Sequence, residues 1–255
     1  ALVGAESGQV RVIDLPSLTT SMEFKVTGKP LAARYSTDGE RVAVRVTRGF
    51  HVLDSEYSPV ASVSLPAINA LTWADDEVVA VTEPGGVFVY SPEGEPQRKE
   101  DFPIAMRGVA FRKGQLQLIT VDERLLQVDP RSLQETGQRR LTFDLLSQRK
   151  IRSARFAKHG PYVLTGEVNK LFFFQGLSKD RSNMFAEHSG VVRDVSFSPS
   201  GEHVAACDSD GVIRILPSVV GSNILTLPRI VTAWGETCAN GWIDDQRILV
   251  GNVQG

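Results

Sequence analysis

The stretch that decides the fold is residues 188–216, HSGVVRDVSFSPSGEHVAACDSDGVIRIL. It contains a short apolar segment that ends in an aromatic residue, Val195–Phe197, and then a polar turn, Ser198-Pro199-Ser200-Gly201. A second apolar segment follows, and Asp210-Gly211 separates it from a third, Val212–Leu216. Segments this short, with alternating side chains and turn residues between them, are typical of antiparallel β-strands.

The same pattern recurs along the whole chain. An aromatic residue ends a short apolar segment and precedes a polar turn at Tyr35, Trp73, Phe111, Phe156, Phe197 and Trp242. The spacing is 38 to 45 residues, which is the length of one four-stranded blade in a β-propeller. We expect the aromatics to fill the space between neighbouring blades, although a row of exposed stacking residues is the alternative.

The repeat predicts an all-β fold, a propeller of four-stranded blades formed by residues 1–255 as a single domain. Five blades are complete, and partial blades lie at residues 1–29 and 229–255. Both partial blades have a second strand, so they do not merge, and the count predicts seven blades when complete. We expect the termini to be cut points inside a longer protein whose flanking sequence completes the ring.

Residues 188–216 resemble a WD40 repeat. In that family a His, a Ser or Thr, an Asp and a Trp form a hydrogen-bonded clamp within a blade. The resemblance assigns the first and third roles to His188 and Asp210, whereas Ala206 and Leu216 occupy the other two positions, so the clamp is incomplete. The other repeats lack both the His and the Asp.

A narrower resemblance concerns residues 160–199. Gly160-Pro161-Tyr162, the segment Leu171–Gly176 and Glu187-His188-Ser189 are similar to a stretch of actin-interacting protein 1, a family with two seven-bladed propellers that assists cofilin in disassembling actin filaments. The family's Pro-Pro-Phe-Lys-Phe segment is replaced here by Leu177-Ser178-Lys179-Asp180. The resemblance implies actin and cofilin as partners.

The composition excludes several classes of function. The formal charge is −2, which does not support uniform attraction to nucleic acid or anionic lipid, and no apolar run is long enough to span a membrane. Only two cysteines occur, outside any metal-ligand spacing, which indicates free thiols and a cytoplasmic or nuclear location. The sequence predicts no metal and no cofactor.

Catalytic motifs are also missing. No G-x-S-x-G, G-x-x-x-x-G-K-[ST], H-E-x-x-H or G-x-G-x-x-G segment occurs. The acidic pairs Asp75/Asp76 and Asp244/Asp245 lie where a turn is expected, and we interpret them as turn residues. We therefore predict a non-catalytic scaffold that binds other proteins, the alternative being a propeller enzyme or small-ligand binder that uses the central channel.

One position offers a candidate binding site. Four residues before the aromatic, three consecutive repeats carry Arg107, Arg152 and Arg193. First strands begin beside the channel, so we expect these residues to form an arc at its mouth. Arginine pairs well with carboxylates and is enriched at binding hot spots, so the arc would bind an acidic loop or helix. The alternative is that the three arginines are solvated, or that they pair with Asp194 and other nearby acids.

Overall fold

The computed structural model divides the chain into two compact units, Ala1–Arg140 and Leu141–Gly255, which are described separately. All regular elements among the described residues are β-strands. No helix in this part of the chain is long and apolar enough to cross a membrane. The structure describes residues 2–4, 8–13, 20–140, 151–156, 162–166, 170–174, 183–187, 190–198, 200–210, 212–217, 230–231, 237–242 and 248–252.

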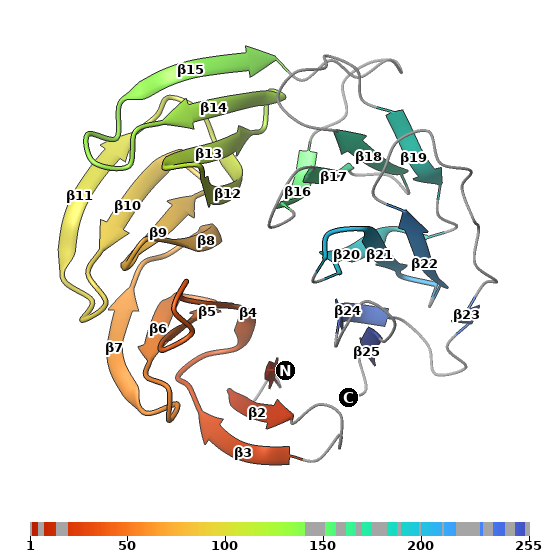
Figure 1. The fold of residues 1–255 in the computed structure, drawn as a ribbon, viewed down its shortest axis with the longest axis horizontal. Coiled ribbons are helices and arrows are strands. Elements are labelled where there is room, and N and C mark those ends of the chain that lie inside the picture. The colour runs from red at the N-terminus through yellow and green to blue at the C-terminus, as the bar shows by residue number, and fades with distance from the viewer. Residues whose placement is uncertain are drawn as a thin grey trace. The chain divides into compact units, whose positions relative to one another are not determined.

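The first unit contains one three-stranded and three four-stranded antiparallel sheets (Figure 1). The three-stranded sheet consists of β1 (Leu2–Gly4), β2 (Gln9–Ile13) and β3 (Thr20–Lys25). The next sheet consists of β4 (Pro30–Tyr35), β5 (Val42–Val46), β6 (Gly49–Leu53) and β7 (Pro59–Ser64). It is followed by β8 (Ile68–Ala74), β9 (Glu77–Thr82), β10 (Gly86–Tyr90) and β11 (Pro96–Asp101). The last sheet consists of β12 (Met106–Arg112), β13 (Gln115–Thr120), β14 (Arg124–Val128) and β15 (Glu135–Arg140).

The second unit repeats this arrangement. Two four-stranded sheets and a two-stranded sheet are described. The first consists of β16 (Ile151–Phe156), β17 (Tyr162–Gly166), β18 (Lys170–Phe174) and β19 (Asn183–Glu187). The second consists of β20 (Val192–Phe197), β21 (His203–Asp208), β22 (Val212–Pro217) and β23 (Ile230–Val231), and the third of β24 (Thr237–Trp242) and β25 (Ile248–Asn252). In every sheet the described strands follow one another in chain order, and neighbouring strands are antiparallel.

The prediction of an all-β chain made of four-stranded sheets is confirmed. The described strands include the three expected near the N-terminus and the two expected near the C-terminus. The number of blades in a complete ring and the assignment of residues 1–255 to a single domain stay predictions.

The predicted repeat of aromatic residues is confirmed in the strands. All six lie in the first strands of their sheets, which are β4, β8, β12, β16, β20 and β24. Trp73 is only 5% exposed and packs in one cluster with Phe50 and Val52 of the preceding sheet. Phe111 packs in the same way against a cluster that includes Val79 and Val81. These two rings fill the space between sheets, as expected.

Tyr35 departs from that expectation. It is 47% exposed, and its hydroxyl lies 3.0 Å from the hydroxyl of Tyr57. The preceding sheet has no first strand among the described residues: β1 to β3 match the second to fourth strands of the other sheets, because Val26 after β3 donates to Gly8 before β2 as Leu65 after β7 donates to Arg48 before β6. Trp73 contacts the first strand of its preceding sheet, at the carbonyl of Arg34, and Tyr35 has no such strand beside it. Tyr57 in turn stacks on Phe24 at a centroid distance of 5.5 Å.

In the β4–β7, β8–β11 and β12–β15 sheets, the second and third strands form the core. In β5, β6 and β9 almost every residue is buried, and the side chains are mainly valine and alanine. Both faces of these strands are covered by neighbouring sheets, which explains why they are apolar runs instead of alternating ones. The fourth strands β7, β11 and β15 carry most of the exposed side chains of these sheets, whereas the first strands β8 and β12 have none.

Candidate functional site

A β-bulge interrupts each of the six first strands at the same place. In β12, Met106 pairs with Thr120 and Gly108 pairs with Ile119, which leaves Arg107 as an extra residue. A bulge of this kind leaves one residue out of the ladder and changes the direction of its side chain. The extra residues are Leu31, Asn69, Arg107, Arg152, Arg193 and Cys238.

These are the six positions that lie four residues before the aromatics. The three arginines that the sequence singled out are therefore bulge residues, two of them in the second unit. The side chains of Arg152 and Arg193 are outside the described residues, and the arc that would join them to Arg107 stays a prediction.

Arg107 is held beside the neighbouring sheet. Its Nη1 lies 3.3 Å from Oε1 of Glu83, in the turn between β9 and β10. The Arg107 side chain is 22% exposed and that of Glu83 is 59% exposed. The Nε atom of Arg107 is buried and donates no hydrogen bond within the described part of the chain. Arg107 thus pairs with a nearby acid, as the alternative interpretation expects, but through only one side of its guanidinium group.

Other polar contacts join the sheets at the same end of their strands. The Nδ2 group of Asn69, the bulge residue of β8, donates a hydrogen bond of 2.7 Å to the carbonyl of Met106. Nη1 of Arg45 donates to the carbonyls of Ile68 at 2.8 Å and Asn69 at 2.9 Å. Three successive sheets are therefore connected, through Arg45 of the second strand β5 and through the residues that open the first strands β8 and β12. The network reaches the carbonyl of Met106, the residue before Arg107.

A second recurring feature lies in the turns between the second and third strands, and the sequence analysis missed it. The last residue of the second strand is a buried polar residue that accepts a hydrogen bond from the backbone N–H four residues later. The three instances are Thr82 with Gly86, Thr120 with Arg124, and Asp208 with Val212. A polar residue followed by three turn residues at the end of an apolar strand was the available signal.

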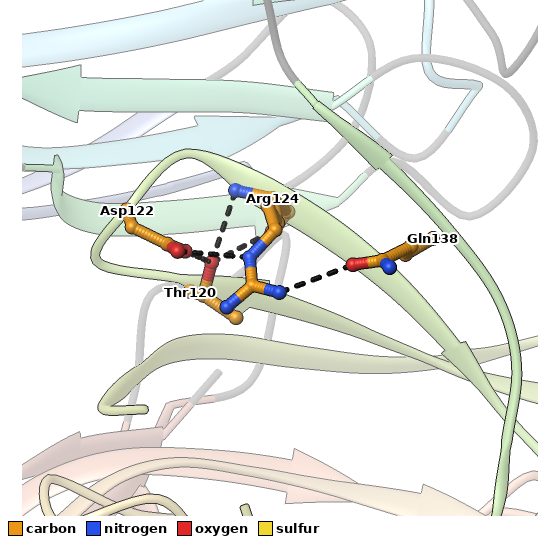
Figure 2. A network of polar contacts seen from close by, with 4 residues as sticks. All are labelled: Thr120, Asp122, Arg124 and Gln138. Carbon is orange, nitrogen blue, oxygen red and sulfur yellow. Dashed lines mark hydrogen bonds and ion pairs between the residues drawn. The ribbon is translucent and has the colours of Figure 1, made fainter. Parts of the chain in front are cut away.

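Figure 2 shows the most extensive of these turns. Oγ1 of Thr120 donates to Oδ1 of Asp122 at 2.5 Å and accepts from the backbone N–H of Arg124 at 2.9 Å. Nε of Arg124 donates to Oδ2 of Asp122 at 2.8 Å, and its Nη1 donates to Oε1 of Gln138 on β15 at 3.1 Å. The turn, β14 and β15 are thus joined by side chains as well as by the ladder.

This network shifts the ionisation of Asp122. Burial alone would raise the pKa of Asp122, but the hydrogen bonds from Arg124 and Thr120 and the positive charge of Arg124 outweigh it, and the pKa lies below its ordinary value. Burial raises the pKa of the adjacent Glu123, an effect that the charge of Arg140 opposes and that of Asp122 reinforces.

The turn between β21 and β22 contains the predicted clamp residue Asp210. Its side chain is exposed, whereas Asp208 is fully buried. Oδ1 of Asp208 accepts from the backbone N–H groups of Asp210 at 3.0 Å and Val212 at 2.9 Å, and Oδ2 lies 3.5 Å from the N–H of Gly190. The assignment of Asp210 as a clamp stays a prediction, and His188 lies outside the described residues.

Asp122 occupies, in the turn between β13 and β14, the middle position that Asp210 has between β21 and β22. The statement that the other repeats lack an Asp at this place is therefore wrong for the β12–β15 sheet. Without the strand register, the two turns could not be aligned by their sequences, Val121-Asp122-Glu123 and Ser209-Asp210-Gly211.

The described residues contain no group of three or more His, Cys, Asp or Glu side chains that could hold a metal ion. Asp75 and Asp76 are exposed in the turn between β8 and β9, where Asp75 has a φ of 52°. Their interpretation as turn residues is confirmed. Asp244 and Asp245 lie outside the described residues.

Comparisons with known proteins agree with this architecture. Residues 179–215 match the WD40 family, described as "WD domain, G-beta repeat". The chain superimposes on the β-propeller domain of Cps50 (Swd1) from Myceliophteria thermophila with a TM-score of 0.77 and 13% identity, over 99% of this chain and 89% of that chain. It superimposes on BamB from Moraxella catarrhalis with a TM-score of 0.68 and 15% identity, over 100% and 91% of the two chains.

At these identities the two structures are evidence for the fold alone. A search of curated proteins found no match to the sequence. The resemblance to actin-interacting protein 1 is therefore a prediction that the comparisons do not support. The sheets, the match of residues 179–215 and the two structural neighbours together support a WD40-repeat β-propeller.

Proposed function

We propose that this protein is a non-catalytic scaffold that binds an acidic loop or helix of another protein through Arg107, Arg152 and Arg193. A WD40-type β-propeller fold suggests a protein-interaction scaffold, because such propellers typically bind other proteins. The observation that carries the proposal is the bulge, which gives these three arginines the same place in consecutive first strands.

The contacts of Arg107 would allow a carboxylate of a partner protein to replace that of Glu83. Its ion pair with Glu83 is exposed and so contributes at most about 1 kcal/mol. A partner carboxylate could bind the guanidinium group in two-point geometry, which a single 3.3 Å contact does not achieve. The part-buried hydrogen bonds of Asn69 and Arg45 hold the backbone beside it, so little backbone freedom would be lost on binding.

The alternative of a channel enzyme or small-ligand binder is not favoured. It would require several acidic or histidine side chains from the first strands, whereas the six bulge positions carry Leu, Asn, Cys and three Arg. The cytoskeletal assignment rests on the resemblance of residues 160–199 alone, and it makes cofilin-decorated actin filaments the first partner to test.

The test compares the intact protein with its Arg107→Ala, Arg152→Ala, Arg193→Ala triple variant. Binding to cofilin-decorated filaments, and to fluorescent glutamate-rich peptides, should weaken by about tenfold or more with little change in melting temperature, since tenfold corresponds to about 1.4 kcal/mol. A matched control removes three positive charges at exposed positions elsewhere, Lys25→Ala, Lys113→Ala and Arg131→Ala. Equal binding by the triple variant and the control would overturn the proposed site.

A further inference from the structure

Within the described part of the chain, no strand pairs with the outer edge of the last strand in each sheet, and these edges differ in charge. Edge strands expose unpaired backbone N–H and C=O groups, and charged side chains commonly protect them from pairing with other chains. Of the last strands with five or more described residues, β3, β11, β15 and β19 each contain at least one charged residue. Only β7, with the sequence PVASVS, contains none.

The register shows which charges β7 lacks. A bulge occurs at the start of both β7 and β11, so Pro59 corresponds to Pro96, Val60 to Gln97, and Ser62 to Lys99. Lys99 forms an ion pair of 2.7 Å with Asp101 and lies over the ring of Phe88. The β11 edge is thus covered by a charged side chain where β7 has a serine.

The faces of β7 are also unequal. Ala61 and Val63 pack against the core cluster shared with the β8–β11 sheet. Val60, Ser62 and Ser64 are exposed, with Val60 38% accessible. β7 therefore presents a free edge with small or β-branched side chains, a composition that favours pairing with another strand (Figure 1).

Opposite charges mark the two ends of this edge. Glu56 lies in the turn that precedes β7. Arg48 lies in the turn between β5 and β6, next to the other end of β7, because its carbonyl accepts a hydrogen bond of 3.1 Å from the N–H of Leu65. Both side chains are exposed. An antiparallel arrangement of two identical edges would bring each Glu56 towards the Arg48 of the other copy.

We propose that a second copy of this chain pairs with β7, strand against strand and antiparallel, to form a twofold-symmetric dimer. In such an interface the same surface is used twice, so an uncharged edge with one acidic and one basic end is self-complementary. A single strand pair buries less surface than a standard interface, so the dimer is weak and its population depends on concentration. This inference does not depend on the proposed arginine site.

The first test introduces lysine on the edge. Sedimentation equilibrium of the intact protein should show a monomer–dimer equilibrium, and Val60→Lys with Ser62→Lys should weaken dimerisation by about tenfold or more. Gln97→Lys, at the position on β11 that matches Val60, is the control and should leave the dimer unchanged. A monomeric wild-type protein, or a dimer that tolerates both lysines, would overturn the proposal.

The second test reverses the end charges. Glu56→Arg and Arg48→Glu should each weaken the dimer because they place like charges together, and the double variant should restore it. If the double variant associates no better than the single ones, the antiparallel arrangement is overturned. Both substitutions lie in turns of the β4–β7 sheet, whereas Arg107 lies in β12 of another sheet, so partner binding should be the same in all of these variants.

Discussion

The indole Nε1 of Trp73 donates a hydrogen bond of 2.9 Å to the backbone carbonyl of Arg34, across the boundary between two sheets. The indole is nearly fully buried and packs with Phe50 of the sheet that it reaches. One residue therefore provides both apolar packing and a polar contact between the first strands β4 and β8. The aromatic position of the repeat requires only a large ring, but here the N–H adds a specific contact.

Two substitutions separate these contributions. Trp73→Phe keeps a ring but removes the donor, and we expect a loss of about 1 kcal/mol in the free energy of unfolding, plus a smaller cost for the lost volume. Trp73→Ala also leaves a cavity and should cost about 3–5 kcal/mol. Urea unfolding measures both. Equal losses for the two variants would show that the hydrogen bond, and not the packing, dominates.

The second prediction concerns the contribution of the buried Thr120 hydroxyl to stability. Thr120→Val keeps the shape of the side chain but leaves the N–H of Arg124 and a carboxylate oxygen of Asp122 without their partner, which should cost about 1–3 kcal/mol. Thr120→Ser retains the hydroxyl and should cost less than Thr120→Val. The pair Thr82→Val and Thr82→Ser should show the same order in chemical unfolding. A valine variant as stable as wild type would contradict the role assigned to this hydroxyl.

The sequence predicted the repeated sheets because two independent signals coincide in each repeat. The period of two residues in segments such as Val212–Leu216 indicates strands, and the spacing of the aromatics gives the length of the repeat. The position four residues before each aromatic was singled out because of its arginines, and the structure shows that it is the site of a bulge. No residue type marks the bulge, since Leu31, Asn69 and Cys238 share it with the arginines.

The sequence did not predict which polar and aromatic side chains are buried. Asp208 and Asp210 belong to the same turn, and their order in the chain does not say which carboxylate the turn encloses. The structure buries Asp208, which accepts the hydrogen bonds of the turn. The exposure of Tyr35 was equally unpredictable, because it depends on the strands of the preceding sheet and not on its own segment.

Two glycines with similar backbone angles should respond differently to alanine. Gly85 has a φ of 104°, and a Cβ atom there would lie 2.3 Å from the carbonyl oxygens of both Phe102 and Ile104. Gly39 has a φ of 82°, but a Cβ atom there would meet nothing within 4 Å. Gly39→Ala should therefore cost about 1–2 kcal/mol for the left-handed conformation alone.

Gly85→Ala should cost more than Gly39→Ala, because the backbone of the turn before β12 must also shift. Thermal unfolding of the two variants side by side provides the comparison. A Gly85→Ala variant at least as stable as Gly39→Ala would show that the segment around Phe102 and Ile104 moves freely.

The lowered pKa of Asp122 predicts how stability changes in acid. A carboxyl group whose pKa is lower in the folded chain than in the unfolded chain binds protons more readily after unfolding. Its contribution is therefore fully present above its ordinary pKa of 3.8 and is lost as the pH falls below that value through the lower pKa of the folded chain. Asp122→Asn removes the negative charge that pairs with Arg124, so the variant should be less stable than wild type at neutral pH.

The difference in melting temperature between wild type and Asp122→Asn should begin to shrink as the pH falls below about 4, where the carboxyl of the unfolded chain takes up its proton, and should be lost below the lower pKa of the folded chain, where the native carboxyl also becomes neutral. Because the Asp122 side chain is 44% exposed, solvent screening keeps this difference small, and high salt should reduce it further. Calorimetry across the acid range at low and high salt measures both effects. A difference that is constant with pH would mean that Asp122 stabilises the turn by its shape and hydrogen bonds and not by its charge.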